Sequence, residues 1–201
     1  MEPVIGRRFA PTRWLAMTVW DHMRKTPLIA FAVAVCTLSG VAAYVSARPA
    51  AAGWREIAWP FPRDGWPAGR AFRCDTALCG GEVELYVRPK IGFCNCDSGV
   101  ADDDEVDRVA DLDLISERFD PVGSGKAIEV AGMKGRLRTY HLQMAAGSQH
   151  PAVGIAVSRR CDLLVASAHG NGEASEVRRV ALRFLGRDDM EQWIKAVLDG
   201  R

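Results

Sequence analysis

Residues 28–47 form an uncharged, largely apolar stretch of twenty residues in a chain of 201. As a helix with a rise of about 1.5 Å per residue, this stretch would be about 30 Å long, which matches the hydrocarbon core of a bilayer. The sequence therefore predicts a transmembrane anchor over 28–47. The chain that follows is long enough for one domain with its own hydrophobic core.

Charges before this stretch predict its orientation, because basic residues there outnumber acidic ones. The basic residues are Arg7, Arg8, Arg13, Arg24 and Lys25, and the acidic residues are Glu2 and Asp21. Basic flanks remain in the cytoplasm, so we expect a single-pass protein of the inner (cell) membrane. Its C-terminal domain would be periplasmic, and the lipid bilayer would be one of its partners.

A cleaved signal peptide is the alternative interpretation of 28–47. Val45, Ser46 and Ala47 would suit a cleavage site formed by small residues. The leader 1–27 and the apolar run are both longer than in most signal peptides, which favours the anchor. Either alternative exports the same domain.

The leader 1–27 is predicted to be cytoplasmic and partly amphipathic. Trp14, Met17, Trp20 and Met23 recur every three residues, with charged residues elsewhere on the helical wheel. Tryptophan and basic residues beside a membrane segment are typical of a helix that lies in the headgroup layer. An unstructured leader is the alternative.

Residues 48–72 are rich in tryptophan and proline. Proline disfavours a regular helix, so we expect an extended strap whose Trp54, Trp59 and Trp66 contact the surface of the domain. An aromatic ligand groove is the alternative interpretation of these tryptophans.

The domain 73–201 contains strand patterns followed by helix patterns. Alternation predicts a strand over 82–88, Pro89 interrupts it, and 91–96 would resume as an edge strand or a bulge. Further strands are expected over 127–130 and 137–144, and a central hairpin over 152–158 and 163–168.

Helical spacing marks the C-terminus. Val177, Val180, Ala181 and Phe184 follow Ser175, a candidate N-cap, and a second helix would begin with the capping pair Asp188 and Glu191. This order predicts an α+β fold: an antiparallel sheet of four to six strands covered by C-terminal helices, preceded by one N-terminal transmembrane helix.

Cys74, Cys79, Cys94, Cys96 and Cys161 all follow the apolar stretch. If 91–96 is extended, Cys94 and Cys96 point to one face, because side chains in a strand repeat every two residues. Thiols oxidise outside the cytoplasm, so we expect disulfides among Cys74, Cys79, Cys94 and Cys96. Because Cys161 is a fifth candidate, fifteen arrangements of two bridges among the five cysteines remain open.

The same four residues, Cys74, Cys79, Cys94 and Cys96, would alternatively bind zinc or copper as thiolates, or act as a redox pair. Apart from this alternative, no cofactor is expected. The clustered carboxylates of 102–105, with Asp107, Asp111 and Asp113, could bind calcium, but no glycine stands where an EF-hand requires one. An acidic helix start over 102–113 is the favoured interpretation.

Catalytic and nucleic-acid-binding signals are weak. His141, His150 and His169 belong to no nucleophile or zinc motif, and no phosphate-binding glycine loop occurs. The 26 basic and 25 acidic residues leave a net charge of +1, which gives no reason to expect a nucleic-acid partner. The sequence therefore favours a protein that is not an enzyme.

These observations lead to one functional hypothesis, one alternative, and a third, weaker class, an enzyme whose site the sequence does not reveal. The chain would be a membrane-anchored, disulfide-stapled accessory protein of a bacterial-type cell envelope. It would dock onto a membrane complex or assist its assembly, with another membrane or envelope protein as partner. The alternative is a thiol-based metal-binding or redox protein that uses the four cysteines of 74–96.

Overall fold

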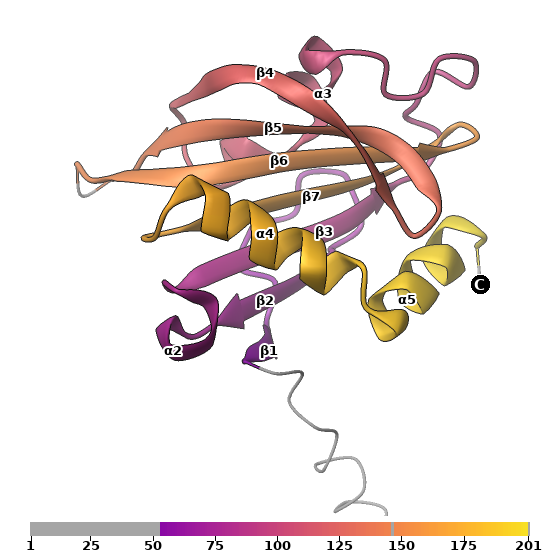
Figure 1. Cartoon of the computed structure of the whole chain (residues 1–201). Helices are drawn as coiled ribbons and strands as arrows, with labels where there is room; N and C mark the ends of the chain where they lie inside the picture. Colours follow the sequence, from indigo (N-terminus) through magenta and orange to yellow (C-terminus); the bar gives the residue numbers. More distant parts are fainter. Residues whose placement is uncertain (1–52, 146, 201) are drawn as a thin grey trace, which may run out of the picture. The chain divides into compact units, whose positions relative to one another are not determined.

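The computed structural model describes residues 53–145 and 147–200, which form an α+β fold built on a seven-stranded antiparallel sheet (Figure 1). The strand order is β1-β2-β3-β7-β6-β5-β4. Both the leader 1–27 and the predicted anchor 28–47 lie outside the described residues. Among the helices that are described, none is long and apolar enough to cross a membrane.

The elements follow one another along the chain with short connections, except between β1 and β2 and before α3. Their bounds are β1 (Trp54–Ile57), β2 (Arg70–Cys74), α2 (Thr76–Cys79), β3 (Val83–Lys90), α3 (Asp103–Val109), the 3-10 helix η1 (Leu112–Leu114), β4 (Phe119–Val130), β5 (Met133–Gln143), β6 (Gln149–Arg159), β7 (Asp162–Gly170), α4 (Ala174–Leu185) and α5 (Asp188–Leu198).

The predicted central hairpin is confirmed as β6 and β7, which pair from Ala152 with His169 to Arg159 with Asp162. Seven strands form instead of four to six. The additional strands are β1 and β2, which lie largely within the segment expected to be a strap, and pair with each other and then with β3.

One face of the sheet is apolar and is covered by α4 and α5 (Figure 1). Val83, Leu85 and Val87 of β3 point to this face and are buried. Val180 and Phe184 of α4 pack into the same cluster, as the helical spacing predicted. The helical region at the C-terminus therefore covers this apolar face and completes the cluster.

The opposite face holds a second apolar cluster beneath α3. Val106 and Val109 of α3 are completely buried there with Tyr140 of β5. Gly154 of β6 allows this close approach, because a methyl group at Gly154 would lie 2.8 Å from the Cβ atom of Ala110. Both faces of the sheet are thus covered, each by a separate layer.

The prediction of a strand over 91–96 is wrong. β3 continues through Pro89 to Lys90, and residues 91–100 form turns and bends. Proline is tolerated at this point because β2 pairs with β3 only as far as Val87, so Pro89 pairs with β7 alone. β3 therefore ends at Lys90, where its pairing with β7 ends, and not at Pro89.

The tryptophan-rich segment divides into a strand and a connection. Trp54 lies in β1, is 7% exposed and contacts Phe184, with ring centroids 4.6 Å apart. In the connection that follows β1, Trp59 lies against Tyr86 at 6.1 Å and Trp66 against Phe93 at 5.1 Å. The connection therefore crosses the face of the sheet that carries α3.

Candidate functional site

Polar side chains gather on the α3 face where β3 and β7 pair. Glu84, Tyr86 and Arg88 alternate with the buried Val83, Leu85 and Val87, so they point away from α4 and α5. His169 of β7 stands opposite Glu84 in the strand register. A short alternating sequence thus places an acid, a phenol and an imidazole together.

Glu84 is the centre of this group. Its carboxylate accepts hydrogen bonds from Arg73 and from the Tyr86 hydroxyl, and Nε2 of His169 lies 3.5 Å from its Oε2 atom. Interaction with His169, Tyr86 and Arg73 lowers the pKa of Glu84 to about 2, although burial opposes this shift. Burial, followed by the hydrogen bond to Glu84, raises the pKa of Tyr86 above its usual value.

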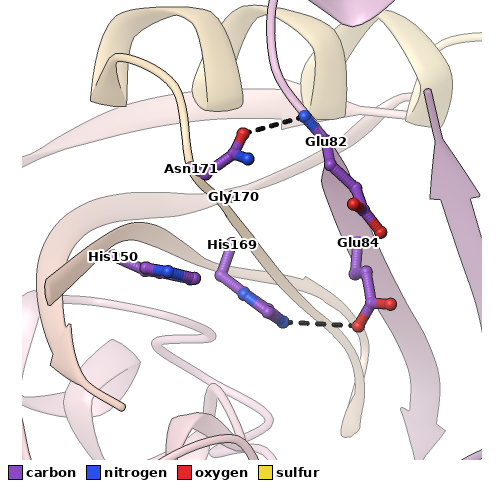
Figure 2. Close-up of a pocket in the computed structure, with 6 residues that line it drawn as sticks. All are labelled: Glu82, Glu84, His150, His169, Gly170 and Asn171. Carbon is purple, nitrogen blue, oxygen red and sulfur yellow. Dashed lines mark hydrogen bonds and ion pairs between the residues drawn. The ribbon is translucent and has the colours of Figure 1, made fainter. Parts of the chain in front are cut away.

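A pocket of about 220 Å³ opens beside this group (Figure 2). It is lined by Glu82, Glu84, His150, His169, Gly170 and Asn171. One wall is held by the Asn171 side chain, whose Oδ1 atom accepts a hydrogen bond of 2.9 Å from the Glu82 amide. The pocket lies at the end of the β3–β7 ladder where both strands meet the chain leading to α4.

His150 of β6 and His169 of β7 face this pocket together. Their ring centroids are 6.1 Å apart, with 24° between the ring planes. The Nδ1 atoms of both rings are buried and have no hydrogen-bond partner among the described residues. Both histidines lie within strands, His150 in β6 and His169 in β7.

A second polar group, at the other end of β3, fixes the connection after β1. Arg88 is 2% exposed and binds Asp64 through both terminal nitrogens, at 3.0 and 2.7 Å, and Asp111 through Nε at 2.6 Å. Lys90 donates to Asp111 and to the carbonyl oxygen of Val109. This network explains why the connection lies on the sheet.

The acidic stretch at 102–113 is a helix start. Asp102 caps α3 by accepting a hydrogen bond of 2.9 Å from the Glu105 amide. Asp103 binds Arg136, and Asp107 accepts the Tyr140 hydroxyl at 2.6 Å. These carboxylates hold α3 on β5, which supports the favoured interpretation over a calcium site.

The cysteines form two disulfides, Cys74–Cys79 and Cys96–Cys161, whereas Cys94 is a buried thiol. Three of the four cysteines expected in bridges are therefore bridged, and the expectation for Cys94 is corrected. Cys96 finds its partner in Cys161, the residue whose role was left open. Residues 91–100 are not extended, so Cys94 and Cys96 do not share a strand face.

The alternative four-thiolate site is not assembled. Cys74 pairs with Val83 at the start of β3, whereas Cys161 lies near Leu163, which pairs with Lys90 at the end of β3. These ends are about 23 Å apart at roughly 3.3 Å per residue. Within 53–145 and 147–200, no group of three or more His, Cys, Asp or Glu residues is arranged to hold a metal ion.

An apolar groove of about 520 Å³ lies between β1, α2 and α4. It is lined by Trp54, Leu78, Cys79, Val180, Arg183, Phe184 and Arg187. Leu78 is 65% exposed, and its side chain is presented by a short helix that the Cys74–Cys79 bridge closes. The groove lining therefore combines apolar side chains with two arginines.

Comparison with known proteins finds distant structural similarities. The structure resembles the solution structure of cyanobacterial PsbP (CyanoP) from Synechocystis sp. PCC 6803 over 73% of this chain and 77% of that chain, with 12% identity and a TM-score of 0.39. It also resembles LpqN, involved in cell envelope biogenesis of Mycobacterium tuberculosis, over 66% of this chain and 72% of that chain, with 12% identity and a TM-score of 0.34. No protein family and no curated protein matches the chain. Similarities at this level assign neither a family nor an activity.

Proposed function

We propose that this chain is an exported, membrane-anchored accessory protein of the cell envelope. In this proposal, residues 28–47 hold the protein in the inner membrane, and the disulfide-stapled domain works on the periplasmic side. Its task is to dock onto a membrane complex or to assist the assembly of one. The anchor would keep the domain near such a partner and raise its local concentration there.

The pair of disulfides is the observation that carries this proposal. Cys74–Cys79 and Cys96–Cys161 bring together four of the five cysteines that follow the apolar stretch. Structural disulfides persist in oxidising compartments and are rare in the cytosol. The bridges therefore support the export that the sequence of 1–47 predicts independently.

The groove between β1, α2 and α4 is the surface that best suits docking. Exposed Leu78 provides an apolar contact, and exposed Arg183 contributes positive charge. A complementary partner segment would carry apolar and acidic side chains, since opposite charges favour the correct pairing. We assign this groove to such a segment of a membrane or envelope protein.

Export is tested on the intact full-length chain by alkylation without reduction, under denaturing conditions, followed by mass spectrometry. Six cysteines less the four bridged ones leave two alkylated thiols, Cys36 and Cys94, if the anchor is retained. A cleaved signal peptide would leave Cys94 alone. Six alkylated cysteines, with a C-terminal reporter active only in the cytosol, would contradict export.

Docking is tested by purifying the full chain from its own membranes in mild detergent. Leu78→Glu should reduce the amount of a specific co-purifying membrane protein, because it places a charge at the mouth of the apolar groove. Ile91→Glu is the matched control, since Ile91 is 52% exposed and is not part of the groove lining. Docking through the groove would be refuted if both substitutions reduced the co-purifying protein equally. It would also be refuted if no membrane protein co-purified specifically with the wild-type chain.

A further inference from the structure

Two buried imidazole nitrogens without partners mark the pocket between β3, β6 and β7. They are the Nδ1 atoms of His150 and His169. Buried polar atoms in proteins nearly always have a hydrogen-bond partner or bind an ion, so two such atoms in adjacent rings require an explanation. In Figure 2 the two rings lie side by side, and the outer nitrogen of His169 points toward Glu84.

The environment of His169 fixes which of its nitrogens carries the proton. Nε2 lies 3.5 Å from the Glu84 carboxylate, which only accepts hydrogen bonds, so Nε2 carries the hydrogen. In the neutral ring, Nδ1 then presents a lone pair. Arg73 and Tyr86 hold the carboxylate in place. A histidine oriented by a carboxylate through its outer nitrogen is the usual arrangement of a metal-binding imidazole.

His150 has a comparable arrangement on the other side of the pocket. Its Nε2 atom lies 3.5 Å from the Ser148 hydroxyl, while Nδ1 faces no protein partner. Each histidine thus has a polar neighbour at Nε2 and none at Nδ1. The two rings come from neighbouring strands, β6 and β7, which are joined by a continuous ladder.

The distance between the rings is compatible with one shared ion. An imidazole nitrogen binds zinc at about 2.0–2.1 Å, and the ring centroid lies about 1.1 Å behind the nitrogen. Two such rings would have centroids about 5 Å apart at a tetrahedral angle and about 6.3 Å apart at a linear one. The observed 6.1 Å lies within this range, toward the wide-angle end.

The charge around the pocket also suits a cation. Glu82 and Glu84 both line it, and no lysine or arginine does. Arg73 contacts both carboxylates, at 3.3 and 2.7 Å, so one positive charge faces two negative ones. Anionic lining lowers the energy of a bound cation.

We propose that this pocket binds one divalent transition-metal ion, Zn²⁺ or Cu²⁺, through Nδ1 of His150 and Nδ1 of His169. Glu84 is the positioning residue for His169. Imidazole is a preferred ligand of both ions. Because no third His, Cys, Asp or Glu of the described chain completes a metal group, solvent would occupy the remaining coordination positions.

The test is calorimetric titration of the full chain in detergent, with its disulfides intact, using ZnCl₂ and then CuCl₂. One ion should bind per chain, and His150→Ala or His169→Ala should each weaken binding at least tenfold. His141→Ala is the control, because His141 is exposed on β5. Glu84→Gln should weaken binding by about ten- to hundredfold while the stoichiometry stays at one.

A second measurement identifies the ligating atoms. The ¹⁵N resonances of the two Nδ1 atoms should shift on addition of Zn²⁺, whereas those of His141 should not. His150→Gln serves as a milder variant if His150→Ala lowers the melting temperature. No binding up to about 100 μM metal, or equal affinity in wild type and both histidine variants, would overturn the proposal.

Discussion

At the scale of single residues, Arg88 is a buried charge whose stability depends on its ion-pair partners. It is 2% exposed, and it needs acceptors for a charge that water cannot reach. Asp64 and Asp111 supply them from two separate segments of the chain. The segment after β1 is therefore attached to the sheet by an ion pair as well as by aromatic contacts.

Removal of the Asp64 charge should destabilise the domain. Asp64→Asn leaves Arg88 with Asp111 and weakens two charge-assisted hydrogen bonds, so we expect a loss of about 1–3 kcal/mol in the free energy of unfolding. Urea denaturation measures this change. Glu129→Gln, at an exposed position of β4, should stay within about 0.5 kcal/mol of wild type. Equal stability of the two variants would contradict the role of Asp64.

Asp64 also makes stability depend on pH. The hydrogen bonds from Arg88 lower its pKa from 3.8 to about 2 in the folded protein. Because the folded pKa is below the unfolded one, this contribution is complete above about pH 4 and is lost as the pH falls toward 2. Unfolding free energies of wild type and Asp64→Asn should therefore converge between pH 4 and pH 2. A difference that stays constant over this range would disprove the linkage.

At the scale of elements, helices and the central hairpin were predictable because their signals are local. The spacing of Val177, Val180 and Phe184 defines the inner face of α4 without knowledge of its partners. Capping was less predictable. α4 begins at Ala174, so Ser175 is inside the helix, and neither α4 nor α5 has a side-chain hydrogen bond at its N-cap.

Strands that depend on distant partners were harder to predict. β1 has four residues, and β4 is largely exposed and contains a register shift between Val122 and Lys126, so neither shows clean alternation. The pocket between β3, β6 and β7 was not predicted, for the same reason. Only the register of β3, β7 and β6 brings Glu84, His169 and His150 together.

The contact between α4 and the β1–β2 hairpin should contribute strongly to stability. Phe184 is 2% exposed and lies between Trp54 and Phe72, with ring centroids 4.6 Å from each. Phe184→Ala should lower the free energy of unfolding by about 3–5 kcal/mol, through lost burial and an aromatic cavity. Chemical denaturation followed by tryptophan fluorescence measures the loss. Leu78→Ala, at a 65% exposed site, should change stability by less than about 1 kcal/mol.

At the scale of the whole domain, the two disulfides act at different ranges. Cys74–Cys79 closes a loop with a sequence separation of 5, whereas Cys96–Cys161 joins residues 65 apart. Cys96–Cys161 connects the loop after β3 to the turn between β6 and β7, at the end of the sheet where Lys90 pairs with Leu163. Removal of Cys96–Cys161 should therefore raise the conformational entropy of the unfolded chain more than removal of Cys74–Cys79.

Loop-closure entropy gives the expected order of the two bridges. The longer loop corresponds to about 4 kcal/mol and the shorter loop to about 2 kcal/mol at room temperature. Replacement of both Cys96 and Cys161 by serine should thus destabilise the domain more than replacement of both Cys74 and Cys79. Both partners must be replaced together, because a single Cys96→Ser would leave Cys161 beside Cys94, whose amide donates to the Cys161 carbonyl at 3.0 Å. Urea denaturation of the two double variants, each compared with wild type, measures the order, and the reverse order would show that native contacts around α2 outweigh chain entropy.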